Sequence, residues 1–138
     1  MADWITLNVG NFLTVDKMNA FNNNFDVIKN FFNQDLDFKD VSVTYNIDIG
    51  LILEKMNSVE DNIQNIENNV DWINPFFKDF EWVKNTLNKK QNIQRWASYL
   101  QYTYDVLTQK TKALQYLIDE NGDYILDKYG NYILVLKE

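Results

Sequence analysis

Apolar residues recur in alternating steps of three and four along two stretches of this chain. This spacing, about 3.5 residues on average, places the apolar side chains on one narrow face of a helix. Asn, Asp, Glu and Lys flank that face, so the pattern predicts two amphipathic helices with narrow apolar seams. The seam residues are Met18, Phe21, Phe25, Ile28 and Phe32 in the first stretch, and Met56, Val59, Ile63, Ile66, Val70 and Ile73 in the second.

The two seams lie in copies of one repeat. The sequence KMNAFNNNFDVIKN starts at Lys17 and KMNSVEDNIQNIEN starts at Lys55, with Asn24 and Asn62 at equivalent positions. A short helix cannot bury its apolar face by itself, whereas repeated helices bury theirs against one another. The repetition therefore favours modules that bind partner copies, although each helix taken alone also fits an ordinary amphipathic helix packed within its own domain.

A short extended segment, here called a lead, precedes each predicted helix. It contains one aromatic residue, Trp4 or Tyr45, followed by a glycine. A short amide side chain can bond the main chain of a nearby segment. We therefore predict that the side chains of Asn19 and Asn57, each one residue beyond a seam methionine, hydrogen-bond the main chain of a lead and hold it against the helix. An asparagine with this role is here called a clasp. The intervening sequence NQDLDFKD is expected to be a polar linker.

The second half of the chain continues the helical pattern and then changes character. Asn74-Pro75 predicts a helix restart, with the asparagine as cap and the proline at the first helical position. The longest helix is expected from about Ile93 until Asn121-Gly122 stops it. The endings NGDYILDKY and GNYILVLKE repeat one another and predict a short β-hairpin, which packs on the helix or pairs with other chains. The seam of the long helix comprises Ile93, Trp96, Leu100, Thr103, Leu107, Lys110, Leu114 and Leu117.

These elements predict a mainly α fold of elongated helical, coiled-coil-like modules with short extended leads and a small C-terminal β-hairpin. The tryptophans are candidate docking residues, with a place in the core as the alternative, because tryptophan is enriched at interaction hot spots. They are Trp4, Trp72, Trp82 and Trp96. The expected units are two lead-plus-helix modules at 1–34 and 41–73, a helical segment at 75–120 and a β-rich tail at 121–138. The residues expected at the interface between copies of the chain are Met18, Phe21, Phe25, Ile28, Phe32, Met56, Val59, Ile63, Ile66, Val70, Ile93, Trp96, Leu100, Leu107 and Leu114.

Composition narrows the class of protein. Hydrophobic residues make up 46% of the chain and aromatic residues 15%, which excludes a disordered polymer. The net charge is −7 and the lysines are scattered, so nucleic acid is not an expected partner. The start of the chain lacks the features of a signal peptide, and no apolar run reaches the roughly 18 residues of a membrane span. A soluble protein made in the cytoplasm, with no membrane partner, is expected.

Catalysis and metal binding have little support in the sequence. Cysteine and histidine are both absent, which removes thiolate chemistry and the commonest general base and metal ligand. Asp35, Asp37 and Asp40 cluster in the predicted linker, and DENGD at 119–123 lacks the spacing of a calcium loop. No enzyme activity, cofactor or metal is therefore expected. A hydrolase with a carboxylate pair is the enzyme alternative.

One pattern spans both modules: an aromatic lead, a glycine, an acidic helix start, then Met-Asn and an Asn-containing apolar run. Its residues are Trp4, Gly10, Thr14, Met18, Asn19, Asn24 and Ile28, and then Tyr45, Met56, Asn57, Val59, Glu60, Asn62, Ile63 and Ile66. The pattern resembles short modules at the N-termini of tail-fibre and baseplate proteins of phages that infect low-GC Gram-positive bacteria. NIQRWASYL, from Asn92, is similar to a third such start, and the C-terminal NGDYILDKYGNYILV is similar to short β-repeats of phage fibres.

The resemblance implies a virion structural protein made in the host cytoplasm. Such a protein would be a homotrimer that binds other phage structural proteins and joins a tail, baseplate or collar to a fibre. Two other functions stay open. A bacterial cytosolic coiled-coil interaction module would show the same heptads, and it would be absent from purified virions. A small receptor-binding fibre protein would need a larger β domain than the last twenty or so residues provide.

Overall fold

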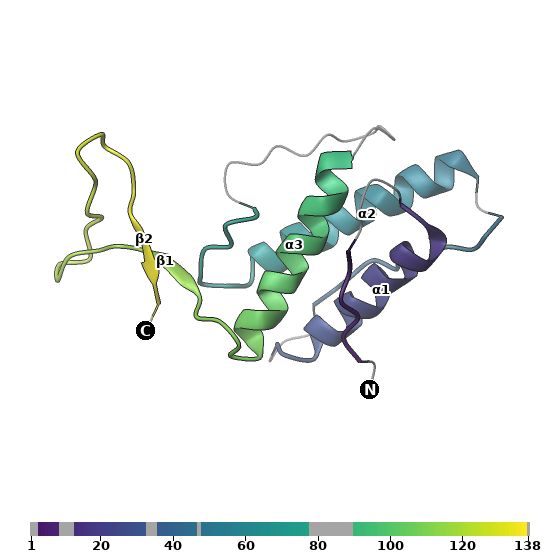
Figure 1. Cartoon of the computed structure of the whole chain (residues 1–138), viewed down its shortest axis with the longest axis horizontal. Coiled ribbons are helices and arrows are strands. Elements are labelled where there is room, and N and C mark those ends of the chain that lie inside the picture. The colour runs from purple at the N-terminus through teal and green to yellow at the C-terminus, as the bar shows by residue number, and fades with distance from the viewer. Residues whose placement is uncertain (1–2, 9–12, 33–35, 47, 78–89, 138) are drawn as a thin grey trace.

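The computed structural model describes residues 3–8, 13–32, 36–46, 48–77 and 90–137 (Figure 1). They form a helical body followed by a C-terminal arm. The prediction of a mainly helical chain with a small antiparallel β pair near its C-terminus is confirmed. The elements are α1 (Val15–Lys29), α2 (Ile49–Glu67), α3 (Lys90–Leu107), β1 (Leu114–Tyr116) and β2 (Leu134–Leu136).

Local sequence decides where the first two helices begin. The Thr14 side chain accepts a hydrogen bond of 3.2 Å from the backbone N–H of Lys17 at the start of α1. Asp48 has the same role for α2 and accepts a bond of 2.9 Å from the N–H of Leu51. Each helix therefore starts at a residue whose side chain satisfies an otherwise unpaired backbone donor.

The three helices run in the same direction around one core. In Figure 1 each begins at its upper end and finishes at its lower end, and between α1 and α2 the chain returns through an extended segment. Lead 2 (36–43) belongs to that segment, and lead 1 (3–8) is the extended segment before α1. An extended residue spans about 3.3 Å and a helical residue about 1.5 Å, so roughly seven extended residues return along a helix the length of α1. Lead 2, with eight residues, is therefore long enough to join two parallel helices.

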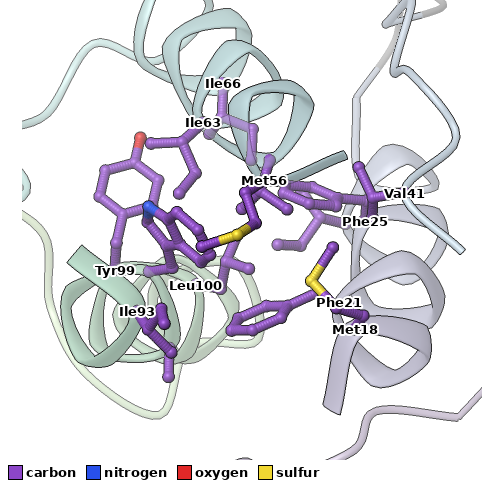
Figure 2. Close-up of a cluster of buried hydrophobic side chains, with 14 of the residues drawn as sticks. Met18, Phe21, Phe25, Val41, Met56, Ile63, Ile66, Ile93, Tyr99 and Leu100 are labelled. Atoms are coloured by element: carbon purple, nitrogen blue, oxygen red, sulfur yellow. The ribbon is translucent and has the colours of Figure 1, made fainter. Parts of the chain in front are cut away.

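The seams of the three helices pack against one another inside a single chain. Figure 2 shows side chains from all three helices pointing toward a common centre, with Val41 of lead 2 beside them. The ring of Phe21 on α1 meets the ring of Trp96 on α3 edge to face, with 5.9 Å between their centroids. The seam residues with at most 7% of their surface exposed are Met18, Phe21, Phe25, Ile28, Met56, Val59, Ile63, Ile66, Ile93, Trp96 and Leu100.

This packing corrects the expectation that the seams lie between copies of the chain. A seam with this period is the geometry of helices around a shared core, whether the neighbouring helices belong to one chain or to several. Here the neighbours of each seam are the other two helices of the same chain, so the buried seam residues are not available to a partner. Of the other expected interface residues, Phe32, Val70 and Leu107 are partly buried and pack against the same core.

The end of α3 differs from the prediction. The helix finishes at Leu107, well before the expected stop at Asn121-Gly122. Gln109 adopts a φ of 62°, in the left-handed region, which turns the chain out of the helix. The N–H of Lys110 bonds to the carbonyl of Asp105 at 2.8 Å and satisfies one of the last helical acceptors. Leu114, expected on the helix seam, therefore lies in β1 instead.

The C-terminal arm, residues 113–137, also pairs differently from the predicted hairpin. β2 pairs antiparallel with β1, so that Leu114 lies opposite Leu136. The segment 124–126, expected to be the partner of β2, makes only isolated bridges. A further bridge between Leu114 and Ile73 connects the arm to the body. Beyond this connection the arm extends away from the helices, as Figure 1 shows.

Candidate functional site

The first candidate site is a set of asparagine side chains that hold the leads against the helices. Asn24 of α1 is buried and bonds both main-chain groups of Ile5 in lead 1. Its Oδ1 accepts from the N–H at 3.0 Å, and its Nδ2 donates to the carbonyl at 2.8 Å. A side-chain amide presents one acceptor and two donors, as a peptide group presents one of each. Asn24 therefore takes the place of a neighbouring strand.

Asn62 of α2 repeats this contact with lead 2. Its Oδ1 accepts from the N–H of Lys39 at 2.8 Å, and its Nδ2 donates to the carbonyl of Lys39 at 2.9 Å. A second asparagine on each helix donates to the carbonyl two residues before the clasped one, over 2.7 Å from Asn23 and 3.2 Å from Asn65. The two modules therefore share one clasp geometry as well as one sequence pattern.

In the structure the second lead begins earlier in the sequence than predicted. Leu36 is buried and Lys39 is clasped, so the segment expected to be a polar linker is, from Leu36 onward, the lead itself. Phe38 packs against the core and takes the position that Trp4 has in lead 1. Tyr45, the expected lead aromatic, is 79% exposed and donates a hydrogen bond of 3.0 Å from its hydroxyl to Asp16.

Asn19, expected to hold a lead, binds lead 2. Its Oδ1 accepts from the N–H of Val43 at 2.8 Å, and its Nδ2 donates to the Val43 carbonyl at 3.1 Å. Asn22 accepts from the N–H of Val41 at 3.0 Å. α1 therefore holds its own lead on one side and the next lead on the other. Asn57 has the matching position on α2 and is partly buried, and its role as a clasp stays a prediction.

Two polar pairs join α2 to α3. Buried Asn92 donates a bond of 2.8 Å to the carboxyl group of Glu60, which is also buried. The hydroxyl of Tyr99 donates a bond of 2.7 Å to Glu67. Burial raises the pKa of Glu67, and burial together with the Glu67 carboxyl raises the pKa of Tyr99 well above its usual range. These pairs connect the helices of the body.

The candidate docking tryptophans have different surroundings. The indole of Trp4 stacks on the ring of Tyr104, with centroids 4.2 Å apart and planes 5° apart, and its Nε1 donates to Gln101 at 3.0 Å. These contacts connect lead 1 to α3, so Trp4 is engaged within the chain. Trp72 is partly buried beyond the end of α2, and Trp82 lies outside the described residues.

The second candidate site is the C-terminal arm, which contains three copies of an eight-residue repeat. Each copy starts with a tyrosine and two aliphatic residues, at 116–118, 124–126 and 132–134. In the two turns between copies, the side chains of Asp119 and Asp127 accept bonds from the N–H groups two and four residues onward. These backbone donors lower the pKa of Asp127. Sequence analysis found the second and third copies and missed the first, which lacks the preceding glycine.

The repeat brings its three tyrosines together. The ring centroids of Tyr116 and Tyr124 lie 5.7 Å apart, and that of Tyr132 lies 4.9 Å from each of them. The main chain of Leu117 bonds to the equivalent residue of both other copies, at 2.7 Å and 3.0 Å. Equivalent residues therefore contact one another in a threefold pattern within one chain. The period of eight between the tyrosines was the signal that would have revealed the first copy.

The arm also exposes much of the apolar surface of the chain. Among the described residues, twelve large hydrophobic side chains are exposed, and seven of them belong to the arm. An apolar surface of this kind on an otherwise packed chain is typical of an interaction site. The seven are Ile118, Tyr124, Ile125, Leu126, Tyr129, Tyr132 and Leu136.

A hollow of the helical body lies beside lead 1. It measures about 320 Å³ and lies between Leu7, Phe76 and the outer face of α3. Among the described residues that line it, Asp105 is the one acidic side chain, so they provide no carboxylate pair. Within the described ranges, no group of three or more His, Cys, Asp or Glu residues is placed to hold a metal ion.

The described helices also lack the length and apolar character needed to cross a membrane. No family model matches the chain, and neither a curated protein nor a solved structure matches it. Its function is therefore inferred from the clasps, the closed core and the exposed arm.

Proposed function

We propose that this protein is a structural component of a phage virion, an adaptor that binds a neighbouring component through its C-terminal arm. The observation that carries the proposal is the contrast between body and arm. The body buries its seams within one chain, whereas the arm exposes seven large apolar side chains. Exposed apolar surface of this extent marks a site where another molecule binds.

The clasps suit a mechanical role for the body. Asn19, Asn24 and Asn62 each make two bonds to the main chain of a lead, so each lead is held at defined positions rather than by apolar contact alone. Pulling a lead away breaks both bonds of a clasp together and leaves a side-chain amide without partners. The resemblance of the modules to phage tail-fibre and baseplate proteins supplies the assembly in which such a body would serve.

We propose that the neighbouring component binds the tip of the arm. Leu126 and Tyr129 lie on either side of the Asp127 turn, and they are 48% and 78% exposed. Tyrosine is one of the residues that most often contribute a large share of the binding energy of an interface. The turn itself is held by its own hydrogen bonds, so the two side chains are presented on a defined loop.

Purified virions provide the test of this proposal. Virions would be purified by density gradient from the virus whose genome encodes this chain, and peptides of the chain would be sought by mass spectrometry. We expect the wild-type chain in the particles and a loss of most of it when Leu126→Ser and Tyr129→Ser are combined. The control is Leu51→Ser, at a residue of α2 that is 41% exposed, and it should be incorporated normally. A chain confined to the soluble lysate would overturn the proposal and favour the cytosolic interaction module.

A further inference from the structure

The outer edge of β2 is open. The N–H of Leu117 bonds to the carbonyl of Ile133 and the N–H of Lys137 bonds to the carbonyl of Ala113, both at 2.7 Å. Main-chain groups of alternate residues on an antiparallel strand point to opposite sides. The N–H and C=O groups of Leu134 and Leu136 therefore face away from β1, where no strand of the described chain pairs with them.

The opposite edge of the same sheet is occupied at Leu114. The N–H of Ile73 donates a bond of 2.7 Å to the carbonyl of Leu114 in β1 and forms an isolated bridge there. Among the described strands β2 therefore presents the outer edge of the pair, with the N–H and C=O groups of Leu134 and Leu136 along it. An open edge pairs readily with another strand because its donors and acceptors are already aligned.

The edge carries neither charge nor proline. Natural edge strands are protected by short length, lysine, proline or a bulge; β2 is short, but it reads Leu134-Val135-Leu136 and Leu136 is 57% exposed. Lys137, the nearest charge, forms an ion pair of 2.7 Å with Asp71. No charge within β2 itself therefore opposes a strand that approaches from outside.

The arm offers apolar surface beyond the edge of β2. A fully exposed side chain of this size class presents roughly 200 Å², so the seven exposed apolar residues of the arm together present about 700 Å². Pairing of β2 covers only the part of this area at and beside Leu136, whereas a standard protein interface takes ~800 Å² from each partner. Exposed side chains of the arm near β2 are therefore expected to add to the contact.

We propose that β2 pairs antiparallel with β2 of a second copy of this chain, about a twofold axis at Val135. In that register Leu134 lies opposite Leu136 of the second copy, so both outward residues of each strand are paired. A second copy fits because the uncharged edge is complementary to itself, and because twofold pairing of the single open edge gives a closed dimer rather than a filament. This inference rests on the proposed function, in which it gives the adaptor two arms side by side.

Sedimentation velocity on the full chain across a concentration series tests the pairing. We expect the wild type to form a dimer, and Leu136→Pro and Leu136→Lys to raise its Kd at least tenfold. Proline removes the outward N–H and lysine places a charge on the edge, while neither removes the N–H groups that face β1. The matched control is Leu51→Lys, which adds the same charge at an exposed position on α2 and should dimerise like the wild type.

Hydrogen exchange of the arm supplies a second measurement that does not depend on the variants folding perfectly. In the wild-type dimer we expect slow exchange at the amides of Leu134 and Leu136, which become fast on dilution, while the Val135 amide stays slow throughout. A chain that is monomeric at all concentrations, a trimer, or a dimer unaffected by both Leu136 variants would overturn the inference. Those outcomes are separate from failure of the proposed function, which is decided by the presence of the chain in particles.

Discussion

Asn92 on α3 donates a hydrogen bond of 2.8 Å to the carboxyl group of Glu60 on α2, and both side chains are buried in the body. Inside a protein such a bond is stronger than in water, and the group left behind when it is broken has no solvent to replace the partner. The pair therefore specifies how α2 and α3 lie against each other.

Replacing Asn92 with alanine should weaken the body. We expect Asn92→Ala to lower the free energy of unfolding by roughly 1–3 kcal/mol, because Glu60 loses a buried donor. Urea denaturation followed by circular dichroism measures the change. Gln94→Ala, at an exposed position of the same helix, is the control and should stay within about 0.5 kcal/mol of the wild type. Equal midpoints for the two variants would show that the pair contributes nothing.

The clasp of Asn24 leads to a second prediction. Asn24→Ala leaves both main-chain groups of Ile5 without their partner, so we expect a loss of about 1–3 kcal/mol in unfolding free energy. Hydrogen exchange at the Ile5 amide should become fast while amides inside α1 stay slow. Asn30→Ala, at the exposed C-terminal end of α1, serves as the control. A slow Ile5 amide in Asn24→Ala would mean that lead 1 is held by other contacts.

The closed core predicts what a seam substitution does. Ile63 is fully buried within one chain, so Ile63→Ala should cost about 2–5 kcal/mol of unfolding free energy without changing the oligomeric state of the folded protein. Leu51→Ala, on the same helix and 41% exposed, should have little effect. Denaturation curves and light scattering together decide the matter. A variant as stable as the wild type but altered in mass would place the seam at an interface between chains.

The raised pKa of Glu67 predicts that the stability of the fold depends on pH. Because burial raises its pKa in the folded chain, the protonated carboxyl is favoured there, and the fold loses stability as the pH rises from the ordinary glutamate pKa through the raised one. Glu67→Gln keeps an oxygen acceptor for the Tyr99 hydroxyl without the charge. We expect the variant to lose less stability than the wild type across that range of pH.

Urea midpoints measured from acid to neutral pH test this expectation. The two proteins should have similar midpoints below the ordinary glutamate pKa, where the wild-type carboxyl is protonated in both states. Above the raised pKa the variant should be the more stable. A wild type that is more stable than Glu67→Gln at neutral pH would mean that the ionised carboxyl is favoured by its surroundings.

The boundary of α3 shows where periodicity stops being informative. Steps of three and four run from Ile93 through Leu107 and continue to Leu114 and Leu117, yet the helix ends at Leu107. Two further leucines are too few to establish that the helical period continues. The spacing of eight between Tyr116, Tyr124 and Tyr132 was the better guide, because it assigns Leu117 to the β-repeat.

For the asparagines, too, the sequence shows the residues but not their partners. The equivalent positions of Asn24 and Asn62 in the repeat were visible in the sequence. The neighbouring residues do not show which lead each side-chain amide bonds. Asn19 bonds Val43, which belongs to the next lead and lies twenty-four residues away. Such a pairing depends on how the helices and leads are arranged in space, so it emerges only once the body is assembled.

The sequence by itself determined the helix faces, the repeat of two modules and the β character of the C-terminus, because side-chain periodicity records which direction an apolar face points. Only the tertiary structure decided that those faces meet one another within one chain. The same period serves three helices of one molecule or one helix from each of three, since it encodes the direction of a face and not the identity of its neighbour.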